Sequence, residues 1–173
     1  MIAASIEFLK IVLLSITAAV VYGILHDQVT ARICVEYFTI AHPPMFDTDS
    51  PTLLAFGWGT IATWWVGFLL GVPAAMLATF GPARRLPARR LVRPLGVLLG
   101  VMACLALMAG VGGYFAAEAG WLDLSGPLGE RIAAEKHSRF FADAAAHLAS
   151  YGMGFFGGIG LCYWIWWQRR MVH

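Results

Sequence analysis

The chain has 173 residues, of which 60% are hydrophobic and only 13% are charged, and its mean hydropathy is +0.72. A soluble domain carries roughly 25% charged residues, so this composition excludes an ordinary soluble protein and predicts an integral membrane protein. The net charge of +2 is small, and the basic residues form no module that reads nucleic acid.

Four apolar stretches are each long enough to cross a hydrocarbon core of ~30 Å, which takes about 20 helical residues. They cover residues 3–25, 53–80, 94–117 and 139–167. Hydrocarbon offers no partner to an unpaired backbone group, and no stretch shows the alternation of a membrane barrel, so all four are predicted to be helices. The fold class is therefore an all-α bundle of four transmembrane helices, with residues 1–173 in one membrane domain.

The first stretch lacks both a basic region and a small-residue cleavage site, which favours an uncleaved helix over a secretion signal. Residues 26–52 follow it as a loop. Read as a strand, the first part of this loop places Glu36 and His42 on one face; read as a helix, it pairs Arg32 with Glu36 instead. The β-branched and aromatic residues favour the strand, but the choice between strand and helix stays open.

The second helix has a clear predicted start, with Ser50 as its N-cap and Pro51 in its first turn. The region before and after this start contains the runs HDQVTARICVEYFT at 26–39, HPP at 42–44 and SPTLLA at 50–55. These runs resemble bacterial multi-pass membrane proteins that carry no assigned activity, and the resemblance extends over most of the chain. It implies one coherent membrane domain of bacterial origin and no mechanism.

The loop between the second and third helices indicates the orientation of the chain. Residues 81–93 hold five arginines and no acid, and the tail at 168–173 contains Arg169 and Arg170. Basic loops of this kind lie in the cytoplasm. Both ends are therefore predicted to be cytoplasmic, while the loops at 26–52 and 118–138 form an extracytoplasmic cap. We expect the bacterial cytoplasmic (inner) membrane, with the cap facing the periplasm or exterior.

This topology gathers the ionisable residues on one side. Every carboxylate except Glu7, and every histidine except His173, falls in the outer loops or at the outer ends of the helices. In the fourth helix Asp143, His147 and Tyr151 recur at four-residue steps and so form one polar stripe. The outer group comprises His26, Asp27, Glu36, His42, His137, Asp143 and His147.

Imidazole and carboxylate groups at one depth are the usual ligands of zinc, iron, copper or manganese. The predicted metal ligands are His26, His42, Asp143 and His147, and the predicted catalytic residues are Glu36, as general base, and Tyr151. An open position on the ion would activate water or admit a redox substrate. This predicts a metal-dependent enzyme for a small or lipid-borne substrate. Simpler alternatives are histidines that only form hydrogen bonds and an ion pair between Asp143 and Arg139.

Two further hypotheses belong to other classes of protein. In a haem-binding electron-transfer subunit, His26 and His147 would be the axial ligands. In an accessory or scaffold subunit, small residues at four-residue spacing, such as Gly154 and Gly158, would pack against a second copy or another membrane protein. Gly96 and Gly100 offer a similar surface on the third helix. The three cysteines form no CxxC pair, which disfavours disulfide exchange.

Overall fold

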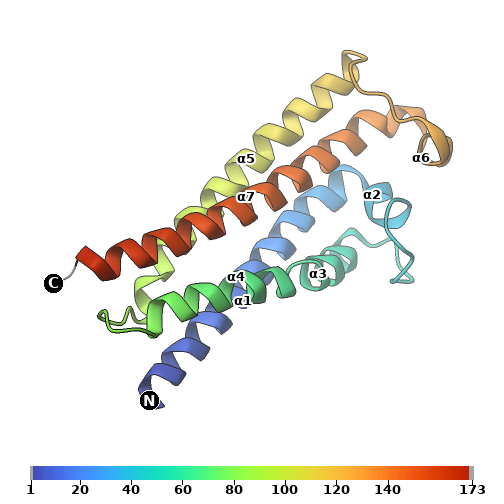
Figure 1. Ribbon diagram of the computed structural model, residues 1–173. Helices are drawn as coiled ribbons and strands as arrows, with labels where there is room; N and C mark the ends of the chain where they lie inside the picture. The colour runs from blue at the N-terminus through green and yellow to red at the C-terminus, as the bar shows by residue number, and fades with distance from the viewer. Residues whose placement is uncertain (1, 172–173) are drawn as a thin grey trace.

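A computed structural model describes residues 2–171, and within that range the chain is helical with no strand (Figure 1). In chain order the elements are α1 Ile2–Ile33, α2 Val35–Thr39, α3 Pro51–Ile61, α4 Trp64–Thr79, η1 Ala88–Arg90, α5 Val92–Glu118, α6 Gly126–Arg131, η2 Ala134–Lys136 and α7 His137–Met171. Four segments are long and apolar enough to cross a membrane, which confirms the predicted number: Ala3–Ile33, Pro51–Thr79, Ala88–Glu118 and Ala134–Met171.

The first helix is longer than predicted. It does not end at residue 25 but continues to Ile33, because residues 26–33 contain no glycine or proline that would stop it. The side chain of Thr30 donates a hydrogen bond to the carbonyl of His26, and that of Arg32 donates to the carbonyl of Gln28, as helical geometry allows. His26 therefore lies about two turns before the end of the helix.

The segment after α1 is helical as well, so the strand interpretation of residues 26–44 is wrong. Cys34 interrupts the helix for a single residue, and α2 follows. Tertiary packing overrides the β propensity here, because Phe38 on α2 is buried in a cluster with Ala31, Leu54 and Trp58. The short helix thereby rests on α3 as part of the cap.

The second long segment consists of two helices joined by a break at Ala62 and Thr63. Ser50 occupies the N-cap position and Pro51 the first turn, as the sequence predicted. At the break, the Thr63 hydroxyl donates to the carbonyl of Gly59. Glycines let this crossing approach α1 closely: a Cβ at Gly59 would lie 2.6 Å from the backbone nitrogen of Ile24.

The helices pack as two antiparallel pairs, α1 with α3 and α4, and α5 with α7, and α4 also contacts α7. Figure 1 shows α5 and α7 side by side along their length. On α5 the contact uses Gly110 and Gly113, which lie against the backbone of α7. Gly96 and Gly100 pack against no other helix of the described chain, since a Cβ at either position would meet only open space.

At the end of the bundle that holds both termini, Arg169 of α7 is buried. Its Nε donates to the carbonyl of Arg84 at 2.8 Å, one terminal nitrogen donates to the carbonyls of Phe80 at 2.7 Å and Leu77, and the other donates to that of Ala83 at 2.6 Å. The guanidinium thereby satisfies carbonyls at the end of α4 and in the loop that follows it.

The opposite end carries α2 and α6, which lie together beyond the long helices (Figure 1). Here the ammonium of Lys136 pairs with the carboxylate of Glu36, and Ile132 is buried against Cys34 and Phe140. The segments that the sequence placed in two outer loops therefore do meet over one end of the bundle.

Candidate functional site

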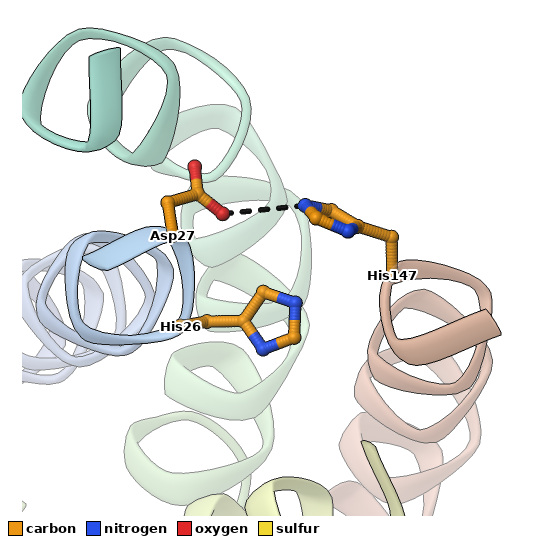
Figure 2. Close-up of side chains that lie close together, drawn as sticks. All are labelled: His26, Asp27 and His147. Carbon is orange, nitrogen blue, oxygen red and sulfur yellow. Dashed lines mark hydrogen bonds and ion pairs between the residues drawn. The ribbon is translucent and has the colours of Figure 1, made fainter. Parts of the chain in front are cut away.

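Three polar side chains converge near this second end, where α1 faces α7. His26 and Asp27 follow each other on α1, and His147 reaches them from α7 (Figure 2). Each offers one ligand atom, and these atoms all lie within 4.8 Å of one another. Asp27 and His147 are buried, with 5% and 6% of their surface exposed.

Hydrogen bonds fix the orientation of the His147 ring. Its Nδ1 lies 2.8 Å from the backbone carbonyl of Asp143, one turn earlier on α7. A carbonyl can only accept, so Nδ1 carries the proton. In the neutral ring Nε2 then holds a lone pair, and this atom lies 3.3 Å from a carboxylate oxygen of Asp27. Two acceptors therefore face each other, and the contact becomes favourable only with a proton or a cation between them.

His26 presents an unused nitrogen to the same place. Its Nε2 is fully buried and has no hydrogen-bond partner. The ring meets that of His147 edge to face, with centroids 4.7 Å apart, and stacks on Tyr22. The Tyr22 hydroxyl in turn lies 2.8 Å from that of Ser150 on α7. A buried nitrogen without a partner costs free energy, which a ligand would recover.

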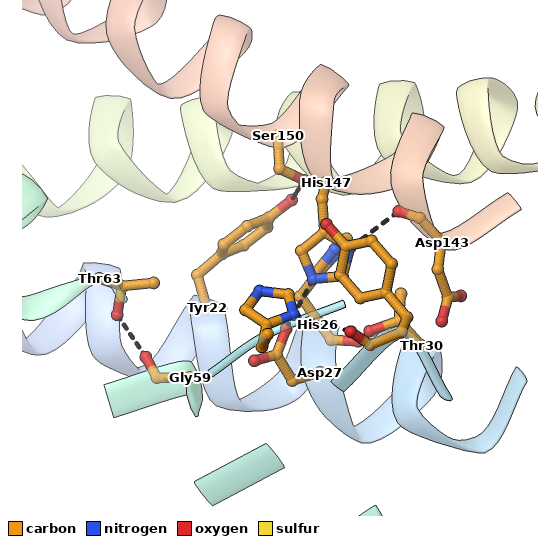
Figure 3. A network of polar contacts seen from close by, with 11 residues as sticks. Tyr22, His26, Asp27, Thr30, Gly59, Thr63, Asp143, His147 and Ser150 are labelled. Atoms are coloured by element: carbon orange, nitrogen blue, oxygen red, sulfur yellow. Dashed lines mark hydrogen bonds and ion pairs between the residues drawn. The ribbon is translucent and has the colours of Figure 1, made fainter. Parts of the chain in front are cut away.

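Asp143, a predicted metal ligand, lies outside the group of three. Its carboxylate points away from the His147 ring (Figure 3), and only its backbone carbonyl contacts that ring. The side chain is fully buried and neither carboxylate oxygen has a hydrogen-bond partner. The described residues show no ion pair between Asp143 and Arg139, the simpler alternative for this carboxylate.

His42, another predicted ligand, also lies outside the group. Its Nδ1 is 2.7 Å from the carbonyl of Tyr37, and its ring packs on Trp58 with centroids 4.7 Å apart. Tyr37 stands between the two histidines, because its ring also stacks on that of His147 at 4.6 Å. Burial raises the pKa of the Tyr37 phenol, which therefore keeps its proton.

Glu36, the predicted general base, belongs to the cap. Burial is the largest single influence and raises its pKa, but the hydrogen bond from Lys136, the charge of Lys136 and hydrogen bonds from the Glu36 backbone and the Cys34 thiol together outweigh burial and leave the pKa below its ordinary value. Burial also raises the pKa of the nearby Cys34 thiol to about 11, so this thiol is neither a thiolate ligand nor a nucleophile near neutral pH. Tyr151, the second predicted catalytic residue, is 49% exposed, and its ring centroid lies 6.3 Å from that of His147.

The sequence interpretation counted Asp27 among the polar residues but did not assign it as a ligand. The signal was present, because a His-Asp pair inside a helix places both groups next to whatever that helix faces. The interpretation missed it because it ended the first helix at residue 25. Once α1 extends to Ile33, His26 and Asp27 become interior helix residues, for which burial demands partners.

An apolar cleft extends from the three residues toward the other end of the bundle, with a volume of about 110 Å³. Its polar end contains Tyr22, His26, Asp27, His147, Ser150 and Tyr151. Its far end reaches Ser15 and Leu161, and its walls are almost entirely aliphatic. Comparison with protein-family models, curated proteins and solved structures finds no match, so the geometry alone carries the functional argument.

Proposed function

We propose that the chain spans a bacterial inner membrane four times, with both ends in the cytoplasm and the cap outside. The four long apolar helices support the spanning, as do the large hydrophobic side chains that they expose, for example Leu107 and Phe115 of α5 at 68% and 64%. The arginines of residues 81–93 support the orientation. The group of His26, Asp27 and His147 then lies in the outer part of the membrane.

We further propose that His26, Asp27 and His147 hold one transition-metal ion. The observation that carries this proposal is the bond from His147 Nδ1 to the carbonyl of Asp143, which leaves Nε2 as the ring nitrogen directed at the Asp27 carboxylate. Histidine ligands in metalloproteins are oriented in this way by a second hydrogen bond. Two imidazoles and a carboxylate suit zinc or iron(II), and copper and manganese are further options.

Three protein ligands leave a coordination position open, as in catalytic rather than structural metal sites. An ion with an open position lowers the pKa of bound water toward ~7 and polarises a carbonyl or phosphoryl group. The cleft beside the site is aliphatic, so the substrate is a small apolar or lipid-borne molecule. Tyr22, Ser150 and Tyr151 are the polar groups beside the open position, and the residues of the cap take no part.

The same geometry favours a metal ion over haem. A macrocycle has to lie between its two axial imidazoles, whereas the rings of His26 and His147 contact each other edge to face. A second candidate function, assembly with a partner membrane protein, is favoured by glycines that face open space on the long helices. These glycines are Gly96, Gly100, Gly112, Gly152 and Gly160. Their exposed positions permit close approach of another helix.

Elemental analysis of the purified protein tests the metal proposal. We expect close to one transition-metal ion per chain in the wild type, and a loss of at least about tenfold in His147→Ala and Asp27→Asn. His137→Ala is the matched control, because His137 lies at the same end but bonds only the carbonyl of Ile132. A wild type without metal, or variants that retain it, would overturn the proposal. Equal loss in His42→Ala would restore the ligand set predicted from the sequence.

A further inference from the structure

A groove separates α5 from α7 toward the end of the bundle that holds both termini (Figure 1). It has a volume of about 490 Å³, within the range of ligand sites. Its lining consists of Arg93, Pro94, Val97 and Leu98 of α5 and Gly157, Gly160, Leu161 and Trp164 of α7. The groove shares only Leu98 and Leu161 with the cleft of the candidate metal site, so it is a different place on the molecule.

Two glycines of α7 give the groove its shape. A Cβ at Gly157 would collide with the side chain of Leu98, whereas a Cβ at Gly160 would meet only open space. The two helices therefore touch at Gly157 and leave a gap beside Gly160. From Gly157 to Trp164 the groove extends about 10 Å along α7, which matches roughly eight carbons of an extended hydrocarbon chain.

One end of this apolar groove carries a charge. Among the described residues that line it, Arg93 is the only charged one, and it lies in the first turn of α5. Trp164 lies at the same level, because Leu91 and Ile165, their near neighbours in the chain, share one buried cluster. Arg93 is exposed, and its guanidinium has neither a carboxylate nor another hydrogen-bond partner in the described part of the chain. A tryptophan and an arginine at one depth are typical of the head-group region of a membrane.

The surroundings of this end add positive charge and little negative charge. The loop at 81–93 holds five arginines and no acid. Glu7 contacts this loop by accepting a hydrogen bond from the backbone of Ala88, but its carboxylate is already paired with Lys10. The first turn of α5 also presents the positive end of a helix dipole, which favours a phosphate. An anionic group in the groove would therefore meet positive charge that the fold leaves uncompensated.

We propose that this groove binds an anionic phospholipid, with its phosphate on the guanidinium of Arg93 and the upper part of an acyl chain between Trp164 and Gly157. The planar guanidinium can donate two parallel hydrogen bonds to a phosphate, and the chain fills the gap beside Gly160. A second copy of the chain fits less well, because its segments at the same depth are also basic. The proposal rests on the proposed membrane location and is independent of the metal ion.

Photo-crosslinking of the full chain in vesicles tests this proposal. The probe is phosphatidylglycerol with a diazirine in the upper part of one acyl chain, and the matched probe is phosphatidylcholine with the same chains. Both lipids carry a phosphate, but choline adds a cation that the arginines repel. We expect phosphatidylglycerol to label residues 94–98 and 157–164 at least about fivefold more, the effect of one arginine beside an anionic lipid. Equal labelling of these residues would overturn the proposal and show bulk lipid in the groove. Labelling of no residue by either probe would refute the membrane location itself.

Two pairs of variants separate the head-group contact from the chain contact. Arg93→Gln should remove the preference for phosphatidylglycerol, whereas Arg170→Gln, which removes the same charge from an exposed arginine stacked on Trp166, should keep it. Gly160→Leu fills the groove and should reduce labelling by both probes, whereas Gly152→Leu, also in open space on α7 but outside the groove, should not. A preference that survives Arg93→Gln would overturn the proposal. Free glycerol phosphate should not compete with the probe, and strong competition would mean that the site takes a soluble phosphate instead.

Discussion

The buried guanidinium of Arg169 at one end of the bundle and the buried carboxylate of Asp143 near the other differ in how far their hydrogen-bonding capacity is used. Arg169 donates to four backbone carbonyls, so its charge is compensated within the fold. Asp143 has no partner for its side chain, and neither has Nε2 of His26 nearby. Buried polar groups are normally satisfied, so Arg169 follows the usual pattern, whereas Asp143 and His26 depart from it.

This difference distinguishes a buried charged group that stabilises the fold from one that does not. A satisfied buried charge stabilises the state that contains it, and its removal should be destructive. An unsatisfied one destabilises the state that contains it, and its removal should be tolerated or even stabilising. The following predictions test this contrast in order of decreasing effect.

Arg169→Ala should have the largest effect, a loss of at least about 3 kcal/mol of unfolding free energy, because four carbonyls lose their donor. Arg169→Lys should restore little of this free energy, since a single ammonium group cannot reach all the carbonyls that the planar guanidinium reaches. The measurement is unfolding of the purified protein in mixed micelles. Arg170→Ala is the control, because Arg170 is exposed and only stacks on Trp166. Equal losses in the two variants would contradict the assignment.

Zinc should stabilise the folded protein by binding to His26, Asp27 and His147. A ligand that binds only the folded state adds about 2.7 kcal/mol at a concentration 100 times its dissociation constant. We expect this gain in the wild type and its disappearance in His147→Ala, measured as the rise in unfolding midpoint on zinc titration. Arg170→Ala should respond like the wild type. A zinc response that persists without His147 would place the ion elsewhere.

Asp143→Leu should stabilise the protein in the absence of ligand by about 1–3 kcal/mol, the usual penalty of an unsatisfied buried polar group. This change in the free energy of unfolding is opposite in sign to the change expected for Arg169→Ala in the same unfolding assay. A destabilised Asp143→Leu variant would mean that the carboxylate has a partner in the folded protein.

The smallest effect concerns Glu36, whose pKa lies below its ordinary value of 4.5 in the folded chain. A lowered pKa contributes stability that is present above pH 4.5 and is lost as the pH falls through the folded-state value. Wild type should therefore lose stability relative to Glu36→Gln on acidification below that pH. The effect is small because Lys136 is partly exposed and water screens the pair. Glu135→Gln, which changes an exposed carboxylate beside Lys136, should titrate like the wild type.

Much of the fold could be predicted because the four long helical segments are apolar enough to span a membrane. The start at Ser50 and Pro51 was equally predictable, since a cap and a proline are local signals. The extension of α1 to Ile33 could not be predicted in this way, because the polar residues after residue 25 suggest the end of a helix that in fact continues through them. The contacts of Gly110 and Gly113 depend on how α5 rotates against α7, which glycine spacing does not specify.

The candidate site could be predicted only in part. His26 and His147 were expected at one depth, and the structure brings them together. Asp143 and His42 were expected beside them, but side-chain direction separates them: the carboxylate of Asp143 points away from the His147 ring (Figure 3), and Tyr37 stands between His42 and His147. Four-residue spacing places residues on one helix face without deciding whether a side chain or a main-chain carbonyl makes the contact. Asp143 contacts His147 through the carbonyl.

The bonds of Arg169 also constrain the order in which the polypeptide can assemble. Their acceptors precede Arg169 by 85 to 92 residues and lie at the end of α4 and in the loop after it, whereas Arg169 belongs to the hairpin of α5 with α7. Because Arg169 follows these acceptors in the chain, the four bonds can form only after the last turns of α7 have been synthesised. Until then the carbonyls at the end of α4 and in the loop after it lack this donor.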